Sequence, residues 1–262
     1  MQRPWFIGPH LKVGRANHHI REFQSGLHKE LANFDGYRIR VDKDSDSIND
    51  ILEFEVTKPV DVIPFTLVAG DAIHNLRSAL DHLWTEIAVR IAGAPDNKRL
   101  YFPMHETRDG VITTIKQGPI KKAAPDICEL VIDHIKPYRG GNLPLWSLNK
   151  LDNIDKHRMP ILIGTVQAIR GVSGKGEGPD PCVIENCSYV IQGTAGEPTV
   201  FRPMSFPKSL KMKITDYGHP IFDIVLSEAT VFEGRSALPL LYELSDLVFG
   251  VIETLKAHMQ RR

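Results

Sequence analysis

The residues of this sequence best suited to chemistry lie together in one helix-like segment. His74, Arg77 and Asp81 are spaced three and four residues apart, so a helix of 3.6 residues per turn places them within about 60° of one another. His82 lies about 140° from Arg77 around the same helix. A histidine that titrates near neutral pH can transfer protons, and an arginine can stabilise charge on a phosphate. The segment can therefore support acid–base chemistry on a phosphodiester.

A second helix-like segment, 144–157, carries carboxylates on its own apolar side. Asp152 and Asp155 fall within the arc of its apolar stripe, which consists of Leu145, Leu148, Leu151 and Ile154. A buried carboxylate without a partner is costly, so a cation or a hydrogen-bond donor should meet each one. We therefore predict that the two helices pack through a polar core made of His74, Arg77, Asp81, Asp152 and Asp155.

The residues alone leave three interpretations of this polar core open. In the first, it is a buried ion-pair network that fixes the register of the two helices. In the second, its histidine and carboxylates bind zinc, manganese or iron, although Arg77 places a fixed positive charge among these ligands. In the third, the segment acts on RNA without a metal.

The third interpretation rests on the spacing of Arg77 and His82, which form the motif R-x4-H. In this motif the sequence resembles the HEPN superfamily of helical-bundle nucleases, in which an arginine is followed a few residues later by a histidine. The resemblance implies that His82 transfers the proton of a ribose 2′-hydroxyl and that Arg77 stabilises the charge on the phosphate. It also implies RNA as the partner, no metal or other cofactor, and a homodimer in which two copies of the motif meet.

A longer part of the chain, from about residue 10 to residue 160, resembles a family of uncharacterised bacterial proteins. The motifs that carry this resemblance are GDxxHNLRSALDHL at 70–83, Phe102-Pro103, Pro137-Tyr138 and NIDKHR at 153–158. The resemblance implies a bacterial protein and brings no established activity with it.

Periodic apolar residues predict the elements that position these motifs. We predict helices over 10–34, 69–93, 126–136, 144–157 and 236–259. Alternating apolar residues at 37–41 and 52–56 predict a hairpin with a long acidic loop. Apolar runs broken by Gly and Pro predict further strands over 161–169, 182–192, 198–206, 210–217 and 220–227.

Helices that bracket segregated strands indicate the α+β class, not an alternating βαβ fold. We expect a helical bundle with an antiparallel sheet formed mainly by the C-terminal half. The whole chain, 1–262, is expected to be a single domain. Its helical part would comprise 10–158 plus 236–260, and its strand-rich part 160–228.

Three further stretches carry weaker signals. The acidic loop at 42–53 has oxygen-bearing residues at positions 1, 3, 5, 9 and 12 of a calcium-binding loop, namely Asp42, Asp44, Asp46, Asp50 and Glu53, although we favour a solvated hairpin loop. The glycine-rich stretch 171–178 matches no phosphate-binding motif and is predicted to be a flexible loop. The stretch 199–215 is basic and contains no acid; it either follows a phosphate backbone or forms a solvated strand face.

Composition limits the classes of protein that remain. The chain has 262 residues, 42% of them hydrophobic and 24% charged, which excludes disordered and collagen-like chains and allows a sizeable core. Its 32 basic and 32 acidic residues give no net charge, so global charge indicates neither a nucleic-acid nor a membrane partner. Three cysteines without a C-x-x-C pair, and no signal-like or membrane-spanning stretch, predict a cytoplasmic protein.

We therefore expect a HEPN-like, metal-independent endoribonuclease in which Arg77 and His82 are catalytic, supported by His74, Asp81, Asp152 and Asp155. The alternative is a non-catalytic binding or interaction protein in which the same cluster is a structural ion-pair network. The two differ at His82, which lies in an exposed cleft or at a dimer interface in the first case and is replaceable in the second.

Overall fold

The computed structural model describes residues 5–43, 48–95, 100–157, 162–180, 182–194, 199–227 and 231–261. These residues form helices and antiparallel sheets whose strands lie mostly in the C-terminal half, so the α+β prediction is confirmed. Internal contacts divide the chain into two compact units. The helical unit comprises Met1–Gly26, Phe65–Ile161 and Glu228–Arg262, and the sheet unit comprises Leu27–Pro64 and Leu162–Ser227. No helix in the described ranges is both long and apolar enough to span a membrane.

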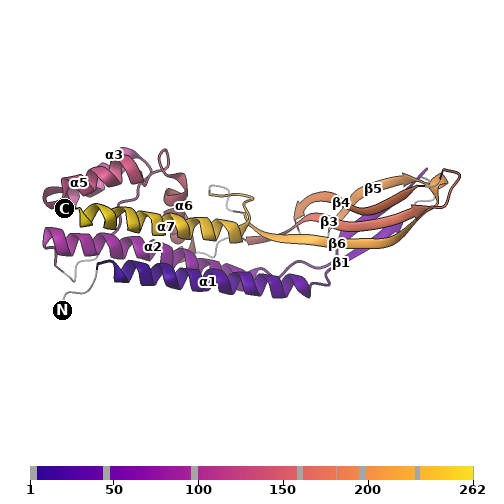
Figure 1. Cartoon of the computed structure of the whole chain (residues 1–262), viewed down its shortest axis with the longest axis horizontal. Coiled ribbons are helices and arrows are strands. Elements are labelled where there is room, and N and C mark those ends of the chain that lie inside the picture. The colour runs from indigo at the N-terminus through magenta and orange to yellow at the C-terminus, as the bar shows by residue number, and fades with distance from the viewer. Residues whose placement is uncertain are drawn as a thin grey trace. The chain divides into compact units, whose positions relative to one another are not determined.

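The longest helices of the helical unit are α1 (Ile7–Ala32), α2 (Ile63–Ala92) and α7 (Ala237–Gln260) (Figure 1). All three were expected from the apolar period, and the stripe of α2 is buried along its length, at Ile73, Leu76, Leu80, Leu83 and Ile87. α2 begins before the predicted residue 69. Pro64 is tolerated there because the first turn of a helix needs no N–H donor.

Hydrogen bonds between side chains give the relative direction of α1 and α7. His10 Nε2 is 2.7 Å from Glu253 Oε1, and Tyr242 donates to Gln24 at 2.8 Å. Later residues of α1 therefore contact earlier residues of α7. The two helices are antiparallel, as in a bundle.

Between α2 and the strands the chain forms shorter helices, α3 (Arg108–Gln117), α4 (Ile120–Ala123), α5 (Pro125–Glu129) and α6 (Leu143–His157). The predicted helix at 126–136 is present as α5 followed by a π-helical turn at Leu130–Ile135. The apolar pattern did not predict α3, because only Val111 and Ile115 of this helix are buried. Two apolar positions are too few to define a period.

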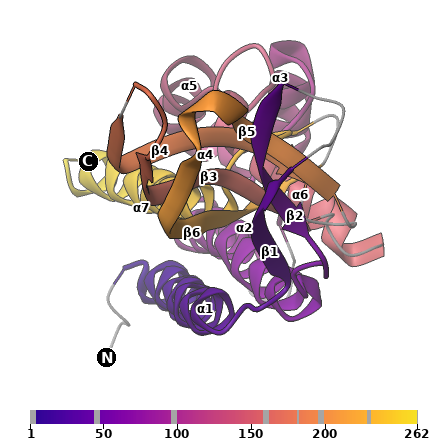
Figure 2. The same ribbon diagram turned by 90° about the vertical axis from the view of Figure 1, so that its right-hand side faces the viewer.

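The sheet unit contains two three-stranded antiparallel sheets. One has the order β1 (Tyr37–Asp42), β2 (Asn49–Val56), β5 (Thr199–Pro207), and the other the order β4 (Val183–Thr194), β3 (Leu162–Gly176), β6 (Met212–Leu226). The predicted hairpin is confirmed as β1–β2. Because β2 also pairs with β5, this hairpin belongs to the sheet unit and not to the predicted helical part at 10–158. Figure 2 shows the purple strands β1 and β2 beside the orange-brown β5.

Two predictions about the strand-rich region are wrong. Residues 210–217 and 220–227 contribute to one continuous strand, β6, and not to two. Gly218 allows this, because its φ is +71° and a Cβ there would collide with the backbone oxygen of Arg170 on β3. The stretch 171–178, predicted to be a flexible loop, is strand as far as Gly176. Its glycines favour a loop locally, but pairing with β4 on one side and β6 on the other holds it extended.

The core of the sheet unit is built from both sheets. Leu52, Phe54 and Val56 of β2 are fully buried against Val166, Ile169 and Val172 of β3. Successive side chains of a strand point to opposite faces. Asp50 therefore lies on the core-facing side of β2, at the start of its apolar row.

Candidate functional site

The predicted polar contact between α2 and α6 is present, and Asp152 is at its centre. This side chain is 1% exposed. Its Oδ1 lies 2.9 Å from Nδ1 of His74 on α2, and its Oδ2 accepts a hydrogen bond from Lys156 on α6. The buried carboxylate thus has a partner on each oxygen, and it links the two helices.

Arg77 is buried in the same helix pair, with 7% of the residue exposed. Its Nη1 pairs with Asp81 one turn along α2, and its Nε donates to Oδ1 of Asn149 on α6 at 2.9 Å. Its Nη2 lies 3.4 Å from the backbone oxygen of Phe102. All three guanidinium nitrogens therefore have acceptors within the protein.

Asp81 connects this ion pair to the Phe102-Pro103 segment. The backbone N–H of Phe102 donates to Asp81 Oδ1 at 2.8 Å. Burial raises the pKa of Asp81 above its ordinary value of 3.8, although the charge of Arg77 and the hydrogen bond from Phe102 act in the opposite direction. Arg77, Asp81 and Phe102, which belong to separate sequence motifs, are thus parts of one network.

Asp155 packs against the backbone of α2 at Gly70. A Cβ at position 70 would collide with the Asp155 carboxylate, so this side chain occupies the space that glycine leaves open. Burial, followed by the charges of Asp152 and Asp71, raises the pKa of Asp155 above its ordinary value of 3.8. Gly70, the first residue of the 70–83 motif, therefore allows α2 and α6 to approach closely.

His82 is exposed and lies apart from this network. A Cβ on Gly8 of α1 would be 3.3 Å from His82 Nδ1, so the imidazole faces the start of α1. It forms no hydrogen bond or ion pair with any described side chain. Arg77 faces α6 and His82 faces α1, as their separation of about 140° around α2 requires. One chain therefore does not bring the two predicted catalytic residues together.

Sequence reasoning missed two side chains of this site, Asn149 and Ser78. The signal for Asn149 was its place one turn before Asp152, on the side of α6 that faces α2. Ser78 Oγ is 3.4 Å from His74 Nε2, so Ser78, His74 and Asp152 are connected in the order found in serine hydrolases. Ser78 lies inside α2, however, where the backbone N–H groups are used by the helix itself and offer no donors to an oxyanion.

The geometry does not assemble the metal site of the second interpretation. Across the described part of the chain, no three histidine, cysteine or carboxylate side chains are placed to hold a metal ion. The oxygens of Asp152 are bonded to His74 and Lys156, and Asp81 is paired with Arg77. The side chains of His74, Lys156 and Arg77 thus occupy the carboxylate oxygens that a metal would need.

The calcium-loop interpretation fails at Glu53. Of the other ligands, Asp44 and Asp46 lie outside the described residues. Glu53 is 3% exposed and is held by Arg40 Nη2 at 3.1 Å and Arg202 Nε at 3.0 Å. Burial alone would raise the pKa of Glu53, but hydrogen bonds from Arg202 and Arg40 hold it below its ordinary value of 4.5. Two arginines therefore bind the carboxylate that would complete the calcium ligands.

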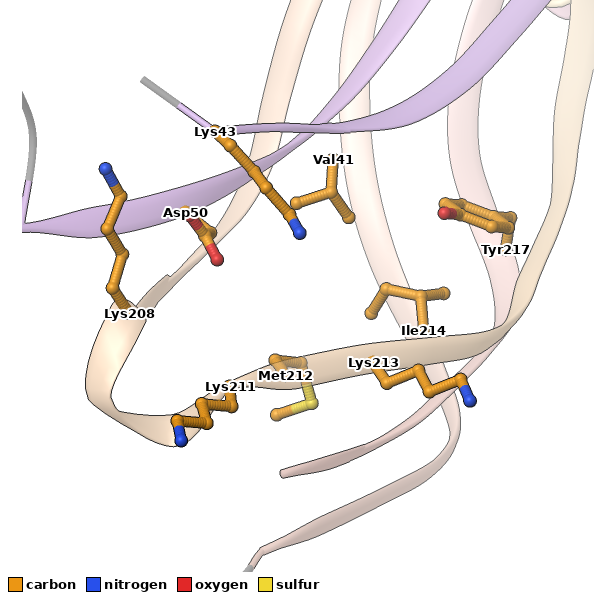
Figure 3. A pocket seen from close by; sticks show the side chains of 9 residues that line it. All are labelled: Val41, Lys43, Asp50, Lys208, Lys211, Met212, Lys213, Ile214 and Tyr217. Carbon is orange, nitrogen blue, oxygen red and sulfur yellow. The ribbon is translucent and has the colours of Figure 1, made fainter. Parts of the chain in front are cut away.

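The sheet unit contains a second candidate site, a cavity of about 620 Å³ between β1, β2, β6 and the turn after β5 (Figure 3). Four lysines line it, Lys43, Lys208, Lys211 and Lys213, together with Val41, Asp50, Met212, Ile214 and Tyr217. Three of these lysines come from the basic stretch 199–215. Lys43 lies just after β1, far from the other three lysines in the sequence, and the pairing and packing of the strands bring it to the same cavity. We refer to this cavity as the lysine pocket.

No family model, no curated protein and no solved structure matches the chain. The function is therefore inferred from the chemistry of the α2–α6 network and of the lysine pocket.

Proposed function

We propose that this protein is a non-catalytic RNA-binding protein, that its lysine pocket binds single-stranded RNA, and that the α2–α6 network is structural. The observation that carries the proposal is the gathering of four lysines and an exposed tyrosine around one cavity of the sheet unit.

The chemistry of the lysine pocket suits a single-stranded nucleic acid. Lysine ammonium groups attract phosphates and release their counterions. Tyr217 is 41% exposed, and an exposed aromatic ring can stack on a base. The volume of about 620 Å³ lies within the range of sites that enclose a small ligand. The bases of a single strand are available to stack on such a ring, whereas those of a duplex are stacked on one another.

The contacts of Arg77 support a structural role for the network. A guanidinium that stabilises a phosphate must be reached by that phosphate. Arg77 is 7% exposed and each of its three nitrogens already has an acceptor. Ribonuclease activity of Arg77 and His82 in a homodimer stays a prediction, and the same RNA samples test it.

Fluorescence anisotropy of a labelled single-stranded RNA, titrated at several salt concentrations, tests the binding site. The variant Lys211→Ala/Lys213→Ala should bind more weakly, and the slope of log K against log[salt] should fall by about 0.7 for each lysine lost. As a matched control, Lys121→Ala/Lys122→Ala removes the same charge from exposed positions of α4. Equal losses of affinity in the two variants would contradict a site in the pocket.

The integrity of the RNA after incubation in excess chelator tests whether the protein is catalytic. Intact RNA supports binding without cleavage. Cleavage that is lost in His82→Ala, while the protein keeps its thermal stability, would instead establish the ribonuclease and overturn the non-catalytic proposal.

A further inference from the structure

One acidic side chain interrupts the positive lining of the lysine pocket. Asp50 is 7% exposed and continues the core-facing row of Leu52, Phe54 and Val56 on β2. An apolar residue would extend the core at this position. The chain instead places a carboxylate at the point where the core of the sheet unit opens into the cavity.

The Asp50 carboxylate has no partner among the described residues: it accepts no hydrogen bond and forms no ion pair. Figure 3 shows it directed into the cavity, between Lys43 and Lys208. Among the described residues no fully enclosed side-chain oxygen lacks a partner, so the Asp50 oxygens are open to the pocket, where water or a ligand can reach them. Glu53 on the same strand differs, because two arginines of the sheet unit are bonded to its carboxylate. A ligand with N–H donors that enters the pocket can therefore replace this water on the Asp50 carboxylate.

The lining of the pocket restricts the chemistry of that ligand. Four lysines line the pocket together with Asp50, so a metal cation would be repelled. The ligand must instead combine an anionic part for the lysines with neutral donors for Asp50. An apolar surface made by Val41, Met212 and Ile214, together with the ring of Tyr217, suits a flat base. A nucleotide has all of these parts.

Among the bases, guanine fits Asp50 best. Its Watson–Crick edge carries two adjacent donors, N1–H and the 2-amino group, which match the two oxygens of a carboxylate. The neighbouring O6 is an acceptor that a lysine such as Lys43 can reach as a donor. Adenine and cytosine place an acceptor beside their amino group, and uracil has one donor between two carbonyl oxygens. Each of these edges repels one oxygen of Asp50.

We propose that the lysine pocket recognises guanine nucleotides, with the base edge on Asp50, the ring against Tyr217 and the phosphate near the lysines. This inference rests on the proposed RNA-binding function and adds base specificity to it. The same chemistry is present in a free guanine nucleotide and in a guanosine of single-stranded RNA.

Competition of the four nucleoside monophosphates and of four otherwise matched RNAs, each with one test base, measures the preference. Guanine should bind about tenfold or more tightly than uracil. Inosine monophosphate lacks the 2-amino group and should bind more weakly than guanosine monophosphate. In Asp50→Asn the preference for guanine should be lost, while the dependence of RNA affinity on salt is retained. Thermal melting of this variant reports whether it folds, and the inosine comparison tests the same contact in the unchanged protein.

The outcomes separate the two proposals and the two sources of guanine. Equal binding of all four bases, with no effect of Asp50→Asn or of inosine, would overturn guanine recognition and leave RNA binding standing. No binding of any RNA or nucleotide would overturn both proposals. If guanosine monophosphate binds as tightly as the guanine-containing RNA, the source is the free nucleotide. If it binds much more weakly, the source is RNA.

Discussion

Buried charges are handled in opposite ways in the α2–α6 network and in the lysine pocket. In the network, Asp152 has a partner on each oxygen and Arg77 has an acceptor at each guanidinium nitrogen. In the pocket, Asp50 is 7% exposed and has no partner among the described residues. The charges of the network are satisfied within the chain, so that removing one of them exposes the cost of burying the other, whereas the Asp50 carboxylate is open to a partner from outside the chain.

The strand that carries Asp50 contains its own comparison. Glu53 lies three residues further along β2 and is even less exposed, at 3%, yet two arginines reach it. The two carboxylates lie on opposite faces of the strand. Glu53 has ion-pair partners and Asp50 has none among the described residues because different side chains lie on the two faces of β2. Basic side chains are present in the sheet unit, since Arg40 and Arg202 reach Glu53.

The largest expected effect is the loss of the buried guanidinium in the network. Arg77→Ala leaves the Asp81 carboxylate without its cationic partner and Asn149 Oδ1 without a donor, so the free energy of unfolding should fall by about 3 to 5 kcal/mol in urea denaturation. The exposed Arg38, paired with Glu55 at 3.7 Å, is the matched control. Arg38→Ala should change stability by less than about 1 kcal/mol. Similar values for the two variants would show that Arg77 is not structural.

An apolar replacement sharpens this test. Arg77→Met/Asp81→Leu removes both charges of the ion pair and keeps much of the packing volume. This double variant should recover a large part of the stability lost in Arg77→Ala, because no unpaired buried charge remains.

A smaller effect is expected at the paired carboxylate of the sheet unit. Glu53→Gln should lower the free energy of unfolding by about 2 kcal/mol at neutral pH, because the hydrogen bonds to two arginines lose their charge assistance. The pKa of Glu53 is lowered in the fold, so its contribution is complete above pH 4.5 and is lost as pH falls through the folded pKa. The variant and the unchanged protein should therefore converge at acid pH. Glu55→Gln, two residues along β2, should differ much less from the unchanged protein at neutral pH.

The smallest effect is expected at Asp155, and its sign is reversed. The pKa of Asp155 is raised in the fold, so ionisation of this group costs stability as pH rises from 3.8 through the folded pKa. Asp155→Asn removes that cost. The variant should be more stable than the unchanged protein at neutral pH, by less than about 1 kcal/mol, and the gain should disappear below pH 3.8. Thermal melts across this pH range measure it, and a variant that is less stable at neutral pH would contradict the raised pKa.

Local periodicity was sufficient for the long helices, the hairpin and the side-chain faces of α2 and α6. His74, Arg77 and Asp81 share one face because helical geometry fixes their angles, and Asp152 faces inward because its neighbours on the same arc are apolar. The need of a buried carboxylate for a partner then indicated that the two helices meet. Local periodicity was not sufficient at residues 171–176, where pairing on both sides outweighs a glycine-rich, loop-like sequence.

By itself the sequence determined the α+β class, the polar face of α2 and the inward carboxylate of α6, because each depends on residues within a few turns of one another. Only the tertiary structure decided that Arg77 and His82 face different helices and that Arg77 is enclosed. It also brought Lys43 and Asp50 to Lys211, Lys213 and Tyr217. These residues lie far apart in the chain. They come together through the pairing and packing of strands in the sheet unit, and these long-range contacts cannot be predicted from local sequence patterns.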